Sequence, residues 1–433
     1  MTNDQYFVAI DIGSSSIKLA IASKTLDEKQ RVQIYALLER PVFGIKRGSI
    51  TDMSELSKAV YDVVAEAESI MGITIQKVLI GINTFGIEFI NSEGYIALSD
   101  NEVNEDDIDR VIRDSFRKAF NVREKEILQH FPINFSLDDQ PGIRNPIGML
   151  GSKLGCRTIT ICAEPVSIRN FSRIFQQADL DILDKLYMPL ISSDLIFTSR
   201  QKNTGAVLVD IGYSSTVYTV WKNDEIVGSG VINIGSQQIS SDIAFVTKTS
   251  LENADEIKKN HLNLLINDNE VNEIEMFDPE TKSNYQLNLE EIRDYAFKRI
   301  EEIFLLLLEN LHRQFNETEY MGGIVLIGGG ANLKGIHDIA KQVTGLPIYN
   351  NIYNESQVKF ILEFDYDCVY ANVVSMLIHS VNNLEEIGLE KNILEVNLNS
   401  NSSHNHKKLT NISRSGNHSS STFWSNIRKW LPF

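Results

Sequence analysis

The sequence has 433 residues, of which 42% are hydrophobic and 23% are charged, a composition typical of folded domains and not of disordered or fibrous chains. At about 100–200 residues per domain, it is too long for one compact core, so we expect two or more lobes. Asp and Glu outnumber Lys and Arg by 58 to 41. The net charge of −17 argues against nucleic acid as a partner and leaves contact with anionic lipid to a local basic segment.

Cysteine spacing and hydropathy indicate the compartment. Cys156, Cys162 and Cys368 follow no pattern typical of a disulfide framework or a zinc site. The first residues lack the basic start and apolar stretch of a secretory signal. The apolar run Ile303–Leu308 is far shorter than the roughly 20 residues that cross a bilayer. These features predict a cytoplasmic, reducing location.

A segment near the start of the chain recurs in its second half. Residues 6–16 (YFVAIDIGSSS) resemble residues 206–216 (AVLVDIGYSST). In both copies an apolar, β-branched run ends in Asp-Ile-Gly, passes through small hydroxyl residues, and continues as alternating residues over Ile17–Ala22 or Val217–Trp221. This pattern predicts two β-hairpins with Gly and Ser at their tips. Their positions predict a duplicated α/β body whose two lobes face one another.

Apolar residues at helical spacing predict two helices between these motifs and after them. The first covers Met53–Ser69 and begins after the polar pair Thr51 and Asp52, and the second covers Leu289–Phe315. Residues Asn260–Ser283 are polar and acidic with weak periodicity. We expect them to form a surface excursion.

A third sharp turn is predicted where a strand beginning at Gly323 runs into a triple glycine, Gly328–Gly330, before a helix over Lys334–Val343. Three residues without a Cβ atom let the backbone approach a flat ligand closely. A strand-to-helix turn without a ligand remains the alternative. The glycines match neither the Walker loop nor the G-x-G-x-x-G dinucleotide pattern.

If the three turns converge between the lobes, they can enclose a phosphorylated nucleotide. Backbone amides and hydroxyls at the two hairpin tips would bind its phosphates. Asp11 and Asp210 would hold Mg²⁺ through water, because this ion keeps most of its hydration shell. Lys18 would reach a phosphate as a point charge, and Gly328–Gly330 would take the adenine and ribose. Taken singly, an aspartate at such a position is more often a turn cap than a metal ligand, and the lysine is more often a solvated charge, so the prediction depends on their joint spacing.

The three turns resemble the motifs of a known superfamily. Asp11–Lys18 (DIGSSSIK) and Asp210–Ser215 (DIGYSS) resemble the two phosphate motifs of the actin-like ATPases, and Ile327–Ala331 (IGGGA) resembles their adenosine motif. Ala254–Lys258 (ADEIK) resembles their adenosine-contacting A-E-x-x-K stretch. That superfamily also contains sugar kinases and heat-shock chaperones, so these motifs alone do not select a function.

A second region distinguishes one family within this superfamily. Residues 91–95 (NSEGY), 102–112, 127–132 (ILQHFP) and 143–154 (IRNPIGMLGSKL) are similar to the inserted subdomain of the bacterial cell-division family FtsA. The resemblance implies a two-lobed, actin-like (ribonuclease H-like, duplicated) α/β fold with an inserted α+β subdomain. The implied segments are a first lobe of residues 1–82 with 161–200 and 361–391, an insert of 83–160, a second lobe of 201–360, a disordered linker of 392–420 and an amphipathic helix of 421–433.

The resemblance also implies a set of nucleotide contacts. In this reading Asp11 and Asp210 are the residues that hold Mg²⁺, and no catalytic residue is assigned. The implied contacts with ATP are Asp11, Gly13, Ser14, Ser15, Ser16, Lys18, Asp210, Gly212, Tyr213, Ser214, Ser215, Gly235, Lys258, Gly328, Gly329, Gly330 and Ala331.

Several residues depart from the family pattern. Tyr213 stands in a phosphate motif that is usually glycine-rich, Val217 stands where that motif usually ends in Asp, and Asp255 replaces the Glu of the adenosine stretch. The hinge segment Met188–Asp194 contains no glutamine of the kind that orients the attacking water in actin. Because phosphoryl transfer depends on positioning, these departures predict a nucleotide switch with weak or absent hydrolysis.

The last residues resemble a membrane-targeting helix that follows a flexible linker. Residues 397–421 are rich in Asn, Ser and His and cannot bury enough surface to fold. On a helix, the apolar residues of 422–433 form one face and the basic residues lie opposite. The alternative is a helix that docks into the apolar groove of a partner protein. The predicted lipid contacts are Phe423, Trp424, Ile427, Arg428, Lys429, Trp430 and Leu431.

As a member of this family, the chain is expected to polymerise on the cytoplasmic side of the inner membrane at the division site. Its partners would be FtsZ, which it would tether there, further copies of itself, later division proteins and anionic lipid, with no nucleic acid. Two alternatives from the same superfamily are a sugar or acyl kinase, which would need a general base in the cleft, and a pilus-assembly protein, which would not account for the Trp-bearing terminus.

Overall fold

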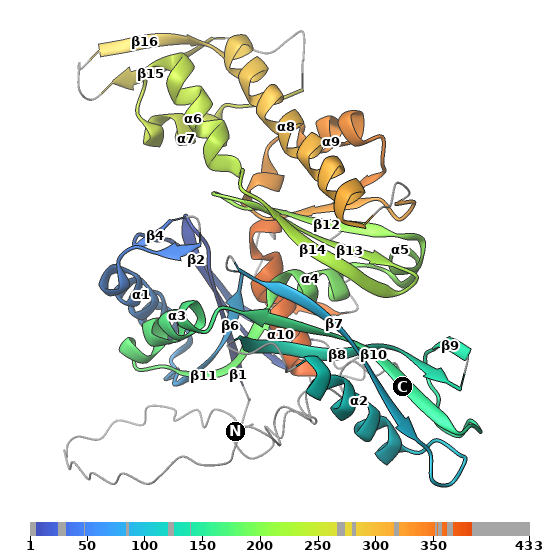
Figure 1. Ribbon diagram of the computed structural model, residues 1–433. Helices are drawn as coiled ribbons and strands as arrows, with labels where there is room; N and C mark the ends of the chain where they lie inside the picture. Colours follow the sequence, from blue (N-terminus) through green and yellow to red (C-terminus); the bar gives the residue numbers. More distant parts are fainter. Residues whose placement is uncertain are drawn as a thin grey trace, which may run out of the picture.

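The computed structural model (Figure 1) describes residues 6–24, 32–46, 48–83, 86–119, 125–138, 140–265, 273–278, 283–315, 320–350, 353, 357–361 and 367–382. The predicted linker of residues 392–420 and the amphipathic helix of residues 421–433 lie outside these ranges. Among the residues described, no helix combines the length and the apolar character that crossing a bilayer requires.

The first large sheet contains the first predicted hairpin. β1 pairs antiparallel with β2, β2 pairs antiparallel with β3, and β6 and β11 continue the sheet parallel to β1. In spatial order the strands are β11 (Asp181–Tyr187), β6 (Lys77–Ile82), β1 (Tyr6–Ile12), β2 (Ser16–Lys24), β3 (Val32–Pro41) and β19 (Val358–Phe360).

The second large sheet repeats this arrangement. β12, β13 and β14 form an antiparallel meander, and β17 and β18 extend the sheet parallel to β12. In spatial order the strands are β14 (Glu225–Ile232), β13 (Thr216–Lys222), β12 (Ala206–Ile211), β17 (Ile324–Ile327) and β18 (Ile348–Tyr349). The same order and the same strand directions in both sheets confirm the predicted duplicated α/β body.

Helices cover the outer faces of both sheets, and two helices lie between the sheets (Figure 1). Their apolar residues join the inward side chains of the strands in continuous cores. The outer helices are α1 (Met53–Met71) and α3 (Pro165–Gln177) on the first sheet, and α6 (Ser236–Thr247), α7 (Leu251–Asn260), α8 (Leu289–Phe315) and α9 (Ile336–Thr344) on the second. A short helix, α5 (Ser199–Thr204), leads into the second sheet.

The central helices are α4 (Met188–Ile196) and α10 (Ala371–Asn382). α10 is buried from Ala371 to Val381, as expected of a helix covered on all sides. On its side of the first sheet the strands carry small residues, among them Ala9 and Ala20, which allow the helix to approach. The two lobes are therefore joined through helices that contact both of them.

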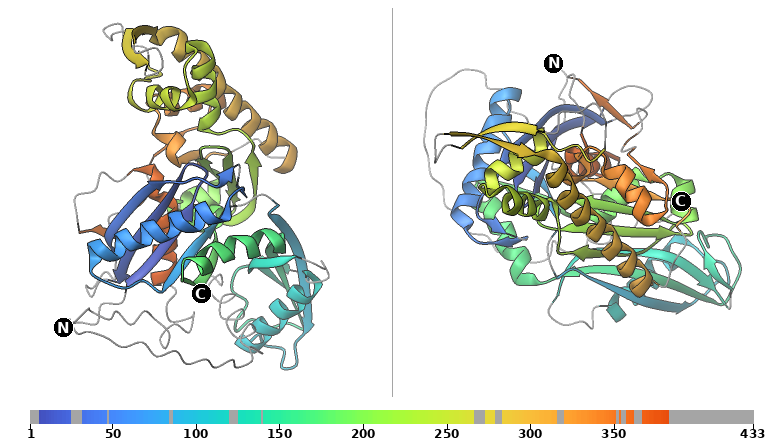
Figure 2. Two further views of the ribbon diagram at one scale, coloured as in Figure 1. Left: turned by 90° about the vertical axis from the view of Figure 1, so that its left-hand side faces the viewer. Right: turned by 90° about the horizontal axis from the view of Figure 1, so that it is seen from above.

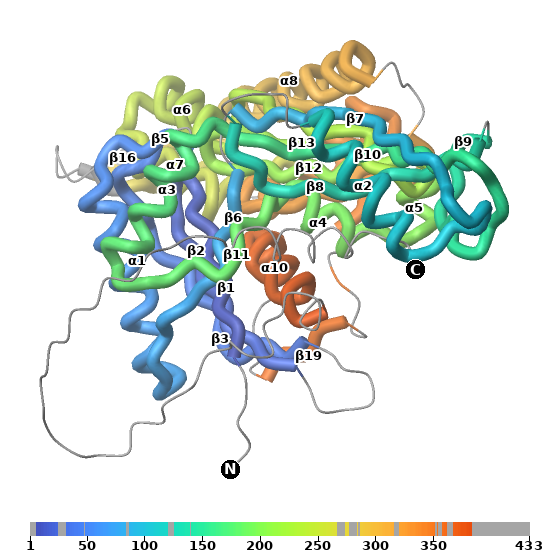
Figure 3. The backbone as a smooth tube through the Cα atoms, turned by 60° about the horizontal axis from the view of Figure 1, so that its bottom comes forward, coloured from blue at the N-terminus to red at the C-terminus, as the bar shows by residue number. Residues whose placement is uncertain are grey.

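The insert leaves the first lobe after β6 and returns at α3. Its sheet has the order β7-β10-β8-β9, and α2 (Glu105–Ala119) covers one face. Figures 2 and 3 show it at the side of the molecule away from α1. Its strands are β7 (Glu88–Ala97), β8 (Glu126–Leu137), β9 (Gln140–Ile143) and β10 (Lys153–Ala163).

The insert also contacts the turn between β13 and β14 in the second lobe. Asn134 Nδ2 donates to Glu225 Oε1 at 2.6 Å, and Arg157 pairs with the same carboxylate. Arg144 pairs with Asp224 at 3.0 Å. The insert is thus tied to both lobes.

The predicted helices agree closely with the observed ones. α1 extends the predicted span to Met71, because Asp52 caps its start and Gly72 ends it at φ 66°. α8 has the predicted bounds. The helix predicted from Lys334 begins two residues later, because Gly335 adopts φ 88° just before it.

The predicted polar excursion contains an unpredicted strand. β15 (Glu273–Asp278) pairs with β16 (Ser283–Asn288) as a two-stranded hairpin before α8. Two short strands, β4 (Ile45–Lys46) and β5 (Ser49–Ile50), form a further small hairpin before α1.

Candidate functional site

A cavity of about 480 Å³ lies between the two lobes, and both predicted hairpin tips line it. The structure therefore brings together turns that are far apart in the sequence. The predicted residues that line the cavity are Asp11, Gly13, Ser14, Ser15, Ser16, Lys18, Asp210, Gly212, Tyr213, Ser214, Ser215, Lys258, Gly328, Gly329 and Gly330.

Two predicted contacts lie behind this lining. Ala331 is 2% exposed and belongs to the core of the second lobe. Gly235 packs against the backbone of the second hairpin tip. A Cβ atom there would lie 2.6 Å from the amide nitrogen of Ser215 and from the carbonyl oxygen of Tyr213. Gly235 thus shapes the cavity through the loop that it supports.

At the first hairpin tip, the turn is closed by a hydrogen bond from the Gly13 amide to the Ser16 carbonyl at 2.9 Å. Lys18 lies opposite Asp11 in the strand register. Its Nζ donates to Ser16 Oγ at 3.0 Å and lies 3.8 Å from Glu39. The lysine charge therefore already has a carboxylate partner, which the sequence reasoning missed because Glu39 comes from the neighbouring strand β3.

The second tip repeats this geometry and touches the first. The Gly212 amide donates to the Ser215 carbonyl at 3.0 Å, the equivalent of the first turn. Val217 takes the register position that Lys18 has in the first hairpin. Ser214 Oγ donates to Ser14 Oγ at 2.7 Å, so the two tips are joined across the cavity by one hydrogen bond.

Two aspartates sit at the ends of β1 and β12 and face this shared cavity. Burial raises the pKa of Asp11, while the Lys18 charge and a hydrogen bond from Asn372 oppose the rise. Burial likewise raises the pKa of Asp210 to about 6, a hydrogen bond from Asn372 opposes it, and the charge of Asp11 adds to it. Two carboxylates that face one cavity, where the charge of Asp11 disfavours the charge of Asp210, are suited to a cation between them.

The triple glycine packs against Asp210 and the end of β12. Gly328 has φ 84°, and a Cβ atom there would lie 2.2 Å from Asp210 Oδ1. At Gly330 a Cβ atom would lie 2.3 Å from the Ile211 side chain, whereas at Gly329 the nearest atom is Val369 Cγ2 at 3.7 Å. Packing against β12 therefore requires glycine at Gly328 and Gly330, and only Gly329 has room to spare.

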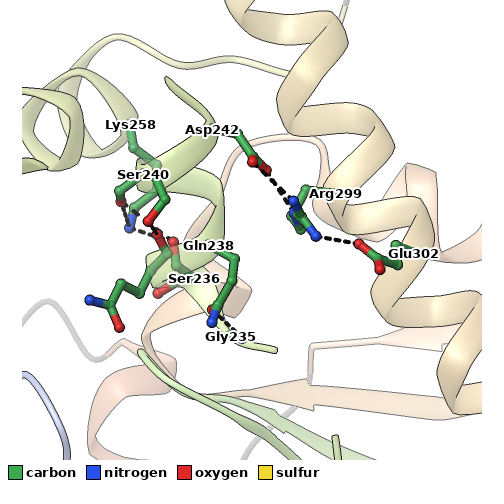
Figure 4. A network of polar contacts seen from close by, with 10 residues as sticks. Gly235, Ser236, Gln238, Ser240, Asp242, Lys258, Arg299 and Glu302 are labelled. Atoms are coloured by element: carbon green, nitrogen blue, oxygen red, sulfur yellow. Dashed lines mark hydrogen bonds and ion pairs between the residues drawn. The ribbon is translucent and has the colours of Figure 1, made fainter. Parts of the chain in front are cut away.

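Lys258 is held in the polar network shown in Figure 4. Its Nζ donates to Asp255 Oδ1 at 2.6 Å, to Ser240 Oγ at 2.8 Å and to the Ser236 carbonyl at 3.1 Å, and lies 5.7 Å from the centre of the Tyr213 ring. Burial alone would raise the pKa of Asp255, but the Lys258 charge and hydrogen bonds from its neighbours hold that pKa at about 2. The ammonium group is thus fixed in place at the cavity wall.

A second pair in the same view ties α6 to α8. Arg299 Nε and Nη2 donate to the two oxygens of Asp242 at 2.6 and 2.9 Å, and Arg299 also contacts Glu302. On α6 itself, the Gly235 amide donates to Gln238 Oε1 at 2.8 Å, which caps the start of the helix. These contacts stabilise the wall that carries Lys258.

Sequence reasoning missed several polar residues of the lining, among them Glu39 and Asn372. Asn372 Nδ2 donates to Asp210 Oδ2 at 3.0 Å. Cross-strand register is the signal that could have placed Glu39 opposite Lys18 once β2 and β3 were paired. No local signal marks Asn372, because its helix reads as an apolar segment.

The duplicated sheets, the central helices and the cavity between the lobes define a protein of the actin-like fold. Among solved structures, the "PilM-PilN type IV pilus biogenesis complex" matches at a TM-score of 0.60 with 14% identity, over 87% of this chain and 98% of that one. MreB5 of Spiroplasma citri bound to ADP matches at 0.52 with 14% identity, over 89% and 98%.

Sequence comparisons identify the family within that class. Residues 86–162 match the family described as "SHS2 domain inserted in FTSA", and residues 207–365 match "Cell division protein FtsA". FtsA of Bacillus subtilis is 29% identical over 81% of this chain and 79% of that protein, and FtsA of Enterococcus hirae is 26% identical over 90% and 86%. The chain belongs to the FtsA family of cell division proteins.

Proposed function

We propose that this chain binds ATP with Mg²⁺ in the cavity between its lobes and, as a filament, anchors the FtsZ ring to the membrane. The observation that carries the nucleotide part is the meeting of two glycine-bearing hairpin tips and two aspartates, Asp11 buried and Asp210 partly buried, around one cavity. MreB5 of Spiroplasma citri, which has the same fold, is described as bound to ADP.

The phosphates would lie between the hairpin tips. Amides in tight turns and serine hydroxyls make concavities that favour anions. The hydrogen bond between Ser14 and Ser214 occupies this position in the structure. An entering phosphate would take over both hydroxyls, so the nucleotide would replace a direct contact between the lobes by one through its own oxygens.

The aspartates fit a magnesium ion. Within the described ranges no group of three or more His, Cys, Asp or Glu side chains could hold a metal, so the protein would contribute two carboxylates, Asp11 and Asp210. Mg²⁺ prefers oxygen ligands and is usually bound by one or two carboxylates together with phosphates and water. When bound, the ion would neutralise phosphate charge that these carboxylates would otherwise repel.

The adenosine would lie toward Lys258 and the triple glycine. Gly329 lines the cavity, and a Cβ atom there would meet only Val369 Cγ2, at 3.7 Å. The Lys258 ammonium, fixed by Asp255, presents a charge at the wall without depending on the ligand. No residue is assigned to activation of water, so we infer a nucleotide switch with weak or absent hydrolysis.

Membrane attachment would depend on residues 421–433, which lie outside the described residues. Two basic residues near an anionic leaflet contribute about 1 kcal/mol each, so a single tail would bind weakly and reversibly. A filament presents many tails, and multivalency would make its attachment firm. A linker of roughly 25 residues reaches about 25–30 Å, enough to separate the body from the lipid.

The family supports the remaining partners. FtsA proteins are cell division proteins by name, and we infer that this one acts at the division site on the cytoplasmic face of the inner membrane. It would contact FtsZ, other copies of itself and later division proteins. Co-sedimentation with FtsZ and anionic vesicles, with and without ATP, tests these contacts together. Pelleting of FtsZ with vesicles that does not depend on this protein would reject the tether.

Replacement of Lys18 tests the nucleotide site. Lys18→Ala should weaken ATP binding about tenfold, because a charge-assisted phosphate contact contributes about 1.5–3 kcal/mol and here is shared with Glu39. Lys24→Ala, at the far end of the same strand, is the matched control. Titration calorimetry measures both, and equal affinity in the two variants would remove Lys18 from the site.

The lipid assignment is tested by a charge on the apolar face of the terminal segment. Trp430→Glu should abolish flotation with anionic liposomes and leave ATP affinity unchanged. Asn426→Glu adds the same charge to the polar face and should weaken flotation only slightly. If the two variants float equally well, residues 421–433 do not bind lipid through that face, and docking into a partner protein would take its place.

A further inference from the structure

Asn372 lies beside both aspartates of the cavity. It lies in the first turn of α10, is 8% exposed, and lines the cavity. Its Nδ2 donates to Asp210 Oδ2 at 3.0 Å, and a hydrogen bond from the same side chain also opposes the raised pKa of Asp11. One amide group, with two N–H donors, thus serves one carboxylate from each large sheet.

The orientation of this amide is fixed from behind. Ser192 Oγ, on α4 and fully buried, donates to Asn372 Oδ1 at 2.9 Å. This contact directs the amide oxygen toward the hydroxyl and away from the carboxylates, which it would repel. The NH₂ group therefore faces the aspartates, and α4 and α10 act together to hold it there.

The amide that donates to Asp210 is neutral, although Lys18 and Lys258 are among the lysines that line the same cavity. Lys18 is held by Ser16 and Glu39, and Lys258 by Asp255 and its neighbours. A neutral amide satisfies carboxylate lone pairs without cancelling their charge. The pair keeps its negative charge for a cation, while its geometry is set by the amide.

We propose that Asn372 is a positioning residue that presents the carboxylates of Asp11 and Asp210 to the Mg²⁺ that accompanies ATP, and so sets the Mg²⁺ dependence of nucleotide binding. This inference rests on the proposed nucleotide site. It assigns a role to a residue of α10 that the family motifs did not mark. Asn372 acts through the aspartates and need not touch the nucleotide.

The test measures ATP binding by the full chain in EDTA and across a series of Mg²⁺ concentrations, by titration calorimetry. Asn372→Leu removes both donors at similar volume. Loss of a group that orients metal ligands typically lowers metal affinity about 10–100-fold, so the Mg²⁺ concentration for half-maximal effect should rise by that factor. Affinity for ATP in EDTA should stay within about threefold, since the amide acts through the ion.

Two further variants complete the design. Asn332→Leu makes the same change at an asparagine that lines the cavity but pairs with Asp367, and should leave the Mg²⁺ midpoint unchanged. Ser192→Ala removes only the hydroxyl that orients the amide. It should raise the midpoint about 3–10-fold, the loss of a single neutral hydrogen bond.

The outcomes separate the inference from the function on which it rests. If wild-type protein binds no ATP, both fail. If it binds ATP and Asn372→Leu leaves the Mg²⁺ midpoint within twofold, or weakens binding equally in EDTA, the inference alone is overturned. Should Asn372→Leu not fold, Ser192→Ala decides by the same criterion. This variant only removes a buried hydroxyl and places no apolar side chain beside the carboxylates.

Discussion

The three consecutive glycines should respond very differently to the same substitution. Gly328→Ala places a Cβ atom 2.2 Å from Asp210 Oδ1 and 2.8 Å from the Ile211 carbonyl, at φ 84°. The backbone strain of such a conformation costs about 1–3 kcal/mol, and overpacking costs about as much again. We therefore expect a loss of about 2–6 kcal/mol in the free energy of unfolding. Gly329→Ala meets only Val369 at 3.7 Å and should change that free energy by less than about 0.5 kcal/mol.

For ATP affinity, Gly329 is the informative position, whereas Gly328 is informative for stability. Gly329 faces the cavity, so its alanine variant should fold normally and still lose ATP affinity if the backbone approaches the adenosine closely. A loss of about tenfold, or 1.4 kcal/mol, is expected for a methyl group that displaces the ligand. Gly345→Ala is the control for backbone strain alone, because it has φ 69° with no atom within 4 Å and should cost about 1 kcal/mol.

Urea unfolding and calorimetric ATP titration of the three variants measure both effects. If Gly328→Ala lowers the free energy of unfolding no more than Gly345→Ala does, Gly328 does not pack closely against Asp210. If Gly329→Ala binds ATP as tightly as the wild type, the glycines serve the strand-to-helix turn alone. The turn without a ligand, which the sequence left open, would then be the correct interpretation.

Two further predictions concern other parts of the chain. Tyr213→Gly should tighten ATP binding several-fold, because the ring that contacts Lys258 occupies the cavity lining. Tyr213→Phe keeps the ring and should leave ATP affinity unchanged. Equal ATP affinities of the Gly and Phe variants by titration would contradict the steric argument. Burial lowers the pKa of His130 to about 3, so the folded state stays neutral while the unfolded state gains a proton below about pH 6.5. Stability therefore falls as the pH falls, by about 2 kcal/mol between pH 7.5 and 5; His130→Gln should remove this part of the loss in urea unfolding, and an equal decline in both proteins would refute it.

The sequence determined those features that depend on neighbours along the chain. Alternating apolar residues that end in Asp-Ile-Gly predicted both hairpins, and helical spacing predicted α1 and α8 to within two residues. The recurrence of one hairpin motif also predicted the duplication, because each half needs its own central sheet. The motifs of the insert and the glycine turns were sufficient to recognise the family, as residues 86–162 and 207–365 confirm.

Only the tertiary structure decided which distant residues meet. Glu39 pairs with Lys18 because β3 lies beside β2, and Asn372 reaches Asp210 because α10 runs between the two sheets. Gly328 is required by the carboxylate of another strand as well as by its own φ of 84°. Periodicity records how a residue relates to its own helix or strand, whereas these contacts depend on how separate elements pack. A buried polar residue on an apolar helix carries no local mark of the partner that it will find.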